Sequence, residues 1–257
     1  MKIALMDSGI GLLPAAAAVR RLRPDAELIL SCDPDGMPWG PRTPEDLTGR
    51  ALDVARAAAG QRPLALIVAC NTATVHALPA LRTAFEPELP VVGTVPAIKP
   101  ASAGGGRVAV WAPPATTGSP YQRGLIARFG TGADITEVPC PGLADAVEHA
   151  DDDAIDRAVA AAAALTPRDV RALVLGCTHY ELVRERIAAA VAPDAVLYGS
   201  ATAVATQALR RAGVEADPDA APAGAPTVFA SGRPGELPRA ALGYPEGRLL
   251  TMVGQPG

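Results

Sequence analysis

Several features that would indicate other classes of protein are missing from this sequence. No apolar run reaches the length of a membrane-spanning helix. The N-terminal segment MKIALMDSG is broken by Asp7, so it is predicted to be a strand and not a signal peptide. The 23 Lys and Arg residues against 27 Asp and Glu give a formal charge of −4, and no basic run occurs. That balance argues against a nucleic-acid partner.

Cysteine and glycine patterns are equally restrictive. Cys32, Cys70, Cys140 and Cys177 form no CxxC pair, so neither a zinc site nor a thioredoxin-like redox site is indicated, and no metal is predicted. A chain of this length with free-looking cysteines and no export signal is expected in the cytoplasm. The G-x-G turn after the first strand lacks a third glycine, whose position is taken by Pro14. A dinucleotide site is therefore not predicted.

The sequence contains one pattern twice. Residues 64–74 read LALIVACNTAT, and residues 172–180 read ALVLGCTHY. Each copy is a short apolar run, typical of a buried strand in an α/β sheet, which ends in a cysteine followed by polar residues. Cys70 and Cys177 are thus expected at the carboxyl ends of two strands, where open α/β sheets bind their ligands.

Both positions favour a reactive thiol. A helix that follows such a turn directs free N–H groups and the positive end of its dipole at the sulfur, which stabilises the thiolate. A single free cysteine is often only a small buried apolar residue, but two in matching polar contexts indicate a pair. Two thiols on opposite faces of one carbon can remove a proton on one side and deliver one on the other. The sequence therefore predicts inversion of a stereocentre without a cofactor.

Strands and helices alternate along the chain, which indicates parallel sheets. Together with the repeated unit, this predicts an α/β protein of two similar Rossmann-like parallel-sheet domains that face each other across an active-site cleft. The polar, glycine-rich stretch around residues 96–106 marks a plausible crossover into the second domain. A helix over residues 75–85 is expected after the first cysteine.

Polar groups near the first cysteine are candidate binding residues. Asp7 and Ser8 follow the first strand and are expected level with Cys70. An acid there could orient or receive a substrate ammonium, although such a pair could equally cap the helix that follows. In the Pro/Gly-rich loop after the second strand, backbone N–H groups near Trp39 and Gly40 could receive an anion.

The second half offers similar groups. Residues 113–119, PPATTGS, form a hydroxyl-rich loop before a helix, which could bind a carboxylate or simply cap that helix. His179 lies two residues past Cys177, close enough to tune the thiol or to cap its helix.

These motifs resemble the cofactor-independent aspartate/glutamate racemase family, and within it the glutamate racemases most closely. They occur in the family's order along nearly the whole chain. The motifs are DSGIG (residues 7–11), Asp33 with PWG (38–40), ACNTAT (69–74), PCP (139–141) with Glu148, and GCTHY (176–180).

The resemblance implies that Cys70 and Cys177 are the two acid/bases at Cα of glutamate. It also implies that Asp7 supports the first thiol, and that Glu148 and His179 support the second. The ammonium and the two carboxylates of the substrate would be held by Ser8, Asn71, Thr72, Thr116 and Thr178, together with the backbone at Trp39 and Gly40.

By the same resemblance, residues 1–96 and 208–257 form the domain that carries Cys70, and residues 97–207 form the domain that carries Cys177. The implied role is the supply of D-glutamate for peptidoglycan. The expected partner is a small-molecule amino acid, and homodimers are frequent in the family.

Four positions depart from the family's usual residues: Leu12 for glycine, Trp39 for tyrosine, Pro113 for threonine and Gly199 for aspartate. They leave the thiol pair intact but alter the predicted pocket, so aspartate or another small amino acid is an alternative substrate. A catalytically idle relative that binds an acidic ligand or a protein partner is a further hypothesis. The two retained thiols argue against it.

Overall fold

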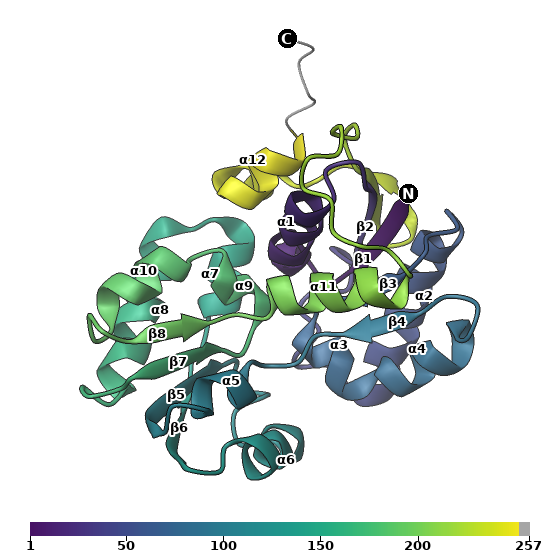
Figure 1. Cartoon of the computed structure of the whole chain (residues 1–257). Coiled ribbons are helices and arrows are strands. Elements are labelled where there is room, and N and C mark those ends of the chain that lie inside the picture. Colours follow the sequence, from purple (N-terminus) through teal and green to yellow (C-terminus); the bar gives the residue numbers. More distant parts are fainter. Residues whose placement is uncertain (252–257) are drawn as a thin grey trace. The chain divides into compact units, whose positions relative to one another are not determined.

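The computed structural model of the chain describes residues 1–251, which form two compact units (Figure 1). One unit comprises Met1–Val95 and the segment from Ala201, and the other comprises Pro96–Ser200. Each is built on its own sheet, of six strands in the first unit and four in the second. The predicted α/β class with two parallel sheets is therefore confirmed. The expectation that two domains face each other across a cleft stays a prediction.

The sheet of the first unit has the strand order β10-β9-β2-β1-β3-β4, and all neighbours are parallel except β9 and β10. Its strands are β1 (Lys2–Met6), β2 (Glu27–Cys32), β3 (Leu66–Val68), β4 (Val91–Gly93), β9 (Thr227–Ala230) and β10 (Arg233–Gly235). Its helices are η1 (Ile10–Leu12), α1 (Leu13–Leu22), α2 (Pro44–Ala59), α3 (Asn71–His76), α4 (Leu78–Phe85), α11 (Ala201–Arg211), η2 (Arg239–Gly243) and α12 (Pro245–Thr251).

Helices cover both faces of this sheet. On one face, Ala4 and Met6 of β1 pack with Leu66 and Val68 of β3 against apolar residues of α2, α3 and α4. Helix α1 packs with α11 and α12 on the other face (Figure 1). Because side chains of a strand alternate between the two faces, a strand covered on both reads as a continuous apolar run. This explains the uninterrupted runs in the sequence of β1 and β3.

The sheet of the second unit has the order β6-β5-β7-β8, with every pair parallel. Helices α5 and α6 pack with Val108, Val110 and Val174 on one face, and α7 packs with α8 and α9. The strands are β5 (Gly106–Ala112), β6 (Ala133–Pro139), β7 (Ala172–Leu175) and β8 (Val196–Tyr198). The helices are α5 (Ile98–Ser102), α6 (Pro120–Phe129), α7 (Leu143–His149), α8 (Asp152–Leu165), α9 (Thr178–Glu181) and α10 (Arg184–Ala190).

Two details differ from the sequence-based expectation. The helix expected over residues 75–85 is two helices, α3 and α4, and the first begins directly after Cys70. Pro79 lies in the first turn of α4, where a missing N–H costs nothing, whereas inside one continuous helix it would break a hydrogen bond. The second change of unit comes between Ser200 and Ala201, before residue 208, because α11 packs on α1.

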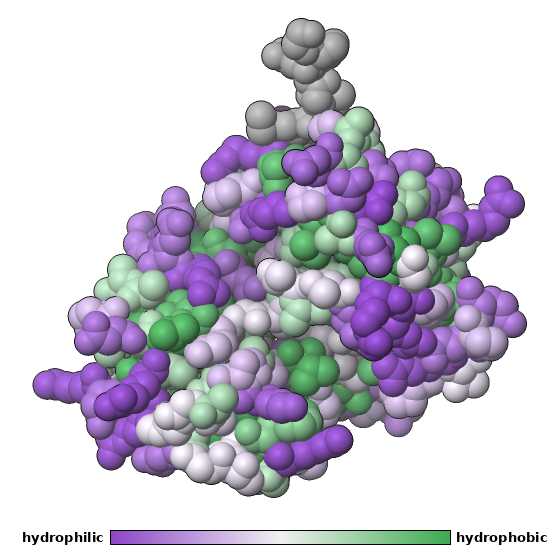
Figure 2. Space-filling view, viewed as in Figure 1, coloured by the Kyte–Doolittle hydropathy of each residue, from purple (hydrophilic) through white to green (hydrophobic). Residues whose placement is uncertain are grey.

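Within residues 1–251, no helix combines the length and the hydropathy needed to span a bilayer. On the face drawn in Figure 2, polar and apolar residues are interspersed.

Candidate functional site

Cys70 lies just past the carboxyl end of β3, in the N-cap position of α3, and is 6% exposed. Strands β1 and β3 pair with Met6 opposite Val68. When this register is extended two residues past the strand ends, Asp7 lies level with Ala69 and Ser8 lies level with Cys70. The first half of the predicted site therefore lies together on one sheet edge, at the carboxyl ends of adjacent parallel strands.

The Asp7 side chain is fully buried beside the start of the following turn. Its carboxylate accepts hydrogen bonds from the backbone N–H of Ser8, at 2.7 Å, and from the Ser8 hydroxyl, at 3.4 Å. The N-cap residues of η1 and α1 are Gly9 and Leu12. Neither Asp7 nor Ser8 occupies the N-cap position of these two helices.

Two threonines that we did not predict as site residues fix the turn at Cys70. The Thr94 hydroxyl donates to the carbonyl of Val68 at 2.9 Å, and the Thr94 N–H donates to the Thr74 hydroxyl at 3.1 Å. Both side chains are buried. These hydrogen bonds connect Val68 at the end of β3, and Thr74 in α3, with Thr94, the residue after β4. A threonine directly after a strand, on the edge that carries the cysteine, is the sequence signal for this role.

Other predicted binding residues follow the two cysteines. Asn71 and Thr72 form the first turn of α3, and Thr178 begins α9. Asn71 and Thr178 are buried, and Thr72 is half-buried.

The Trp39 side chain belongs to the apolar core of the first unit. The ring is 1% exposed, and its Nε1 donates to the Asp33 carboxylate at 3.0 Å. Leu12 is also 1% exposed. Two of the four departures from the family pattern are therefore packed core side chains. Gly40, beside Trp39, is half-buried.

In the second unit, Cys177 follows β7 and occupies the N-cap position of α9. Its Sγ lies 3.8 Å from Nδ1 of His179, and Nε2 of His179 lies 2.8 Å from a carboxylate oxygen of Glu148 on α7. His179 and Glu148 are buried, and Cys177 is partly exposed. The three residues expected to act together in this half are therefore adjacent.

This arrangement favours one tautomer of the His179 imidazole. An ionised carboxylate only accepts hydrogen bonds, so Glu148 favours a proton on Nε2 of His179. Nδ1 is then an acceptor that faces the Cys177 thiol. Helix α9 has only four residues, so its dipole is small. The imidazole–carboxylate pair is the polar contact nearest to the thiol that this half of the site provides.

Cys140 and Pro113 lie on the same edge of this sheet. Ala112 pairs with Pro139, so one residue further Pro113 lies level with Cys140. Trp111 pairs with Leu175, so two residues further Pro113 lies level with Cys177. Cys140 is 1% exposed, and burial raises its pKa to about 12, with the nearby Cys177 acting in the same direction. Cys140 is therefore a neutral thiol at ordinary pH.

The loop over residues 113–119 is closed by its own backbone. The carbonyl of Pro113 accepts hydrogen bonds from the N–H of Thr116, at 2.8 Å, and of Thr117, at 3.0 Å. Glu137 of β6 accepts from the N–H of Gly118 at 2.9 Å, and from the side chain of Gln122 at 2.6 Å. Thr116 is buried within this loop.

A carboxylate already fills the space beside Gly199, where the family usually has aspartate. A Cβ at Gly199 would lie 2.4 Å from an oxygen of Glu181. The other oxygen accepts from the N–H and hydroxyl of Ser200, at 2.7 and 2.9 Å. Glu181 lies in α9, four residues after Cys177, and we did not predict it as a site residue.

Among the described residues, no group of three or more His, Cys, Asp or Glu side chains could hold a metal ion.

Comparison with known proteins places these features in context. The family model described as Asp/Glu/Hydantoin racemase matches residues 13–209. A glutamate racemase of Pseudomonas putida (strain W619) is 34% identical over 213 residues, which is 81% of this chain and 80% of the relative. One from Roseiflexus sp. (strain RS-1) is 36% identical over 208 residues, which is 79% of this chain and 76% of the relative.

Solved structures show the same fold. The crystal structure of Escherichia coli glutamate racemase, in complex with L-glutamate and the activator UDP-MurNAc-ala, aligns with a TM-score of 0.78 at 30% identity. The alignment covers 89% of this chain and 88% of that one.

Proposed function

We propose, since this chain belongs to the Asp/Glu/hydantoin racemase family, that it interconverts L- and D-glutamate by proton transfer at Cα between two thiols. The observation that carries the proposal is the equivalent placement of Cys70 and Cys177. Each follows a central parallel strand and begins a short helix, and each has an acid close by. Asp7 follows β1, the strand that pairs with β3, and Glu148 acts through His179 on Cys177.

In the proposed reaction, the two thiols act on opposite faces of Cα. One sulfur, as thiolate, accepts the α-proton and becomes a thiol. The other, as thiol, donates its proton to the opposite face and becomes a thiolate. Charge and protons balance. After one turnover the thiol and the thiolate have exchanged places, which is the state that the reverse reaction needs. No cofactor is consumed.

The supporting groups differ between the two halves. Nδ1 of His179 can receive the proton of Cys177 and return it, while Glu148 stabilises the imidazolium that forms. Beside Cys70, the buried Asp7 is held by Ser8. We propose that Ser8, Asn71, Thr72, Thr116 and Thr178, with the backbone at Trp39 and Gly40, bind the ammonium and carboxylates of the substrate.

The choice of glutamate is supported by the relatives. Those from Pseudomonas and Roseiflexus are glutamate racemases that are 34–36% identical to this chain, and the E. coli structure contains L-glutamate. The biological role we propose is supply of D-glutamate for peptidoglycan, and the oligomer we propose is a homodimer.

Hydrogen exchange at Cα tests the reaction. The protein is incubated with pure L-glutamate or pure D-glutamate in deuterated water. We expect deuterium to enter Cα, observed by proton NMR or mass spectrometry, while optical rotation decays to zero. Unchanged glutamate in both incubations would contradict the proposal.

Single substitutions test the two thiols. Cys70→Ser and Cys177→Ser should each lower racemisation by at least about 100-fold, because a hydroxyl is a far weaker acid than a thiol. Cys32→Ser is the matched control, since Cys32 is also a buried cysteine at a strand end but has no proposed role. Full activity in either of the first two variants would remove that residue from the mechanism.

Aspartate is the second candidate substrate. The family usually has threonine at position 113, level with Cys177, and Pro113 has no hydroxyl to bind a carboxylate of the substrate there. The same exchange experiment with L- and D-aspartate separates the two. Faster exchange of aspartate than of glutamate would favour it.

A further inference from the structure

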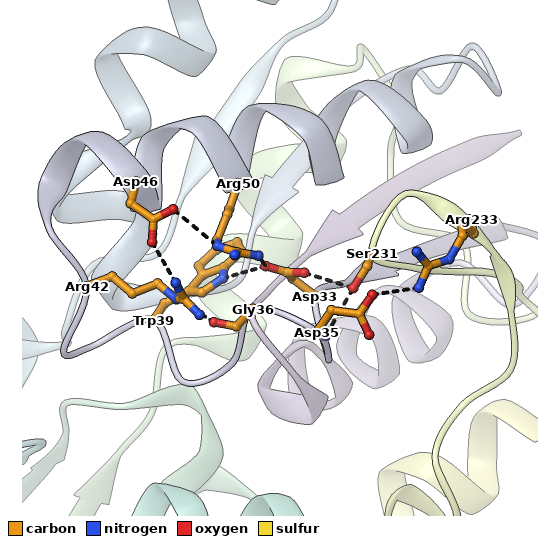
Figure 3. A network of polar contacts seen from close by, with 9 residues as sticks. All are labelled: Asp33, Asp35, Gly36, Trp39, Arg42, Asp46, Arg50, Ser231 and Arg233. Carbon is orange, nitrogen blue, oxygen red and sulfur yellow. Dashed lines mark hydrogen bonds and ion pairs between the residues drawn. The ribbon is translucent and has the colours of Figure 1, made fainter.

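The buried carboxylate of Asp33, just after β2, joins three separate parts of the first unit (Figure 3). One oxygen accepts from Nε1 of Trp39 at 3.0 Å and pairs with Nη1 of Arg50 on α2 at 3.3 Å. The other accepts from the hydroxyl of Ser231, between β9 and β10, at 2.8 Å. Asp33 is only 3% exposed, so the carboxylate depends on these donors in place of water.

The main chain of Asp33 adds two more connections. Its N–H donates to the carbonyl of Ser8 at 3.1 Å, and its carbonyl accepts from the N–H of Gly36 at 3.0 Å. A Cβ at Gly36 would lie 1.9 Å from the Asp33 carboxylate and 2.4 Å from Arg50. The loop passes so close to the carboxylate that only glycine fits there.

Further ion pairs lie on two sides of this carboxylate (Figure 3). Asp46 pairs with Arg50 at 3.3 Å and with Arg42 at 2.6 Å, and Arg233 pairs with Asp35 at 2.6 Å. These pairs are largely exposed, so each contributes little alone. The buried carboxylate is the part of the network that holds the loop.

The loop begins at the sheet edge that carries Ser8, because the Asp33 N–H donates to the Ser8 carbonyl. Among residues 1–251, no acceptor is hydrogen-bonded to the backbone N–H of Trp39 or of Gly40. Gly40 is half-buried and Trp39 is held by its ring. Successive N–H groups in a turn form a concave site for an anion.

We propose that Asp33 is a positioning residue, which clamps the Trp39 indole and thereby sets the backbone at Trp39 and Gly40 for a carboxylate of the substrate. This inference rests on the proposed function. The backbone N–H of Asp33 also donates to the Ser8 carbonyl, so this one residue contacts two parts of the half-site in the first unit. The clamp depends on the indole N–H, which donates to Asp33. In this proposal Trp39, which stands where the family usually has tyrosine, therefore contributes a hydrogen bond as well as bulk.

Two variants and one control test the clamp. Asp33→Ala removes the acceptor, and Trp39→Phe keeps an aromatic ring in the core but lacks the N–H. Asp35→Ala is the control, because it removes from the same loop an exposed carboxylate that pairs with Arg233. Racemisation of glutamate gives KM and kcat for each protein.

We expect Asp33→Ala to raise KM about tenfold and Trp39→Phe to raise it less, with kcat changed little, since the thiols are untouched. The double variant should be no worse than Asp33→Ala, because both changes remove the same contact. An unchanged KM, or a fall in kcat alone, would overturn the proposal. So would a KM change in Asp33→Ala equal to that in Asp35→Ala.

Fluorescence separates failure of the clamp from failure of the proposed function. The two tryptophans, Trp39 and Trp111, are both buried, so acrylamide should quench the unaltered protein weakly. Asp33→Ala should increase the quenching, and Asp35→Ala should not. If the unaltered protein fails to exchange glutamate, the proposed function is contradicted while this measurement still tests the clamp. Unchanged quenching in Asp33→Ala would overturn the clamp.

Discussion

At the scale of single residues, the two proposed acid/bases have different surroundings. Cys177 has an imidazole 3.8 Å from its sulfur, and that imidazole is oriented by the buried Glu148. Cys70 instead lies level with Ser8, whose neighbour Asp7 is fully buried. A proton that Cys177 takes from the substrate can pass on to Nδ1 of His179. The two directions of the reaction are therefore expected to respond differently to the same substitution.

Glu148→Gln tests this orienting role. A glutamine amide can donate to Nε2 as well as accept from it, so it no longer fixes the His179 tautomer, and we expect kcat to fall about 100-fold. Asp145→Asn is the matched control, since Asp145 is an exposed carboxylate on the same helix. Measured racemisation rates for both variants decide the point. Equal rates for Glu148→Gln and the unaltered protein would contradict the role.

The buried thiol of Cys140 leads to a prediction about how the free energy of unfolding depends on pH. Its pKa is raised from 9.0 to about 12 by burial, so the unfolded chain loses this proton first. The resulting stabilisation is complete below about pH 9 and is lost as the pH rises to about 12. Cys140→Ala should therefore show a shallower fall in the free energy of unfolding over that range, measured by urea denaturation. Tyr180, whose pKa burial also raises, is present in both proteins. Parallel curves would contradict the assignment.

At the scale of elements, the repeated strand–cysteine–helix unit was the part of the fold most readable from sequence. An apolar run that ends in cysteine needs only local pattern to be recognised, and both cysteines follow strands, β3 and β7. The resemblance to the aspartate/glutamate racemases is confirmed by the family match. The N-terminal segment predicted to be a strand contains β1.

Features set by tertiary contact were not readable in this way. The division into α3 and α4, the burial of the Trp39 ring and the carboxylate of Glu181 beside Gly199 each depend on neighbours distant in sequence. Thr94 was missed for the same reason, because its partners Val68 and Thr74 are on other elements.

Thr94→Val tests whether the hydrogen bond at the end of β3 helps to position Cys70. The change keeps the shape but removes the donor to the Val68 carbonyl, and we expect a loss of about 1–2 kcal/mol in the free energy of unfolding together with reduced kcat. Thr83→Val is the control, since Thr83 is exposed on α4 and should change stability by less than about 0.5 kcal/mol. Thermal and urea denaturation give the stabilities. Equal stability of the two variants would contradict the role of Thr94.

At the scale of the whole molecule, the chain divides its proposed chemistry between two units. One unit carries Cys70 with Asp7 and Ser8, and the other carries Cys177 with His179 and Glu148. Each sheet brings its own groups to the carboxyl ends of its strands. Neither unit contains both thiols, so the proposed reaction requires that one substrate engage both.

Protection of the thiols from alkylation tests that requirement most directly. The protein is treated with iodoacetamide at increasing glutamate concentrations, and modification of each cysteine is followed by mass spectrometry. We predict that glutamate protects Cys70 and Cys177 together, with the same half-maximal concentration, because a single bound molecule covers both. Protection of one thiol without the other, or at clearly different concentrations, would contradict the account.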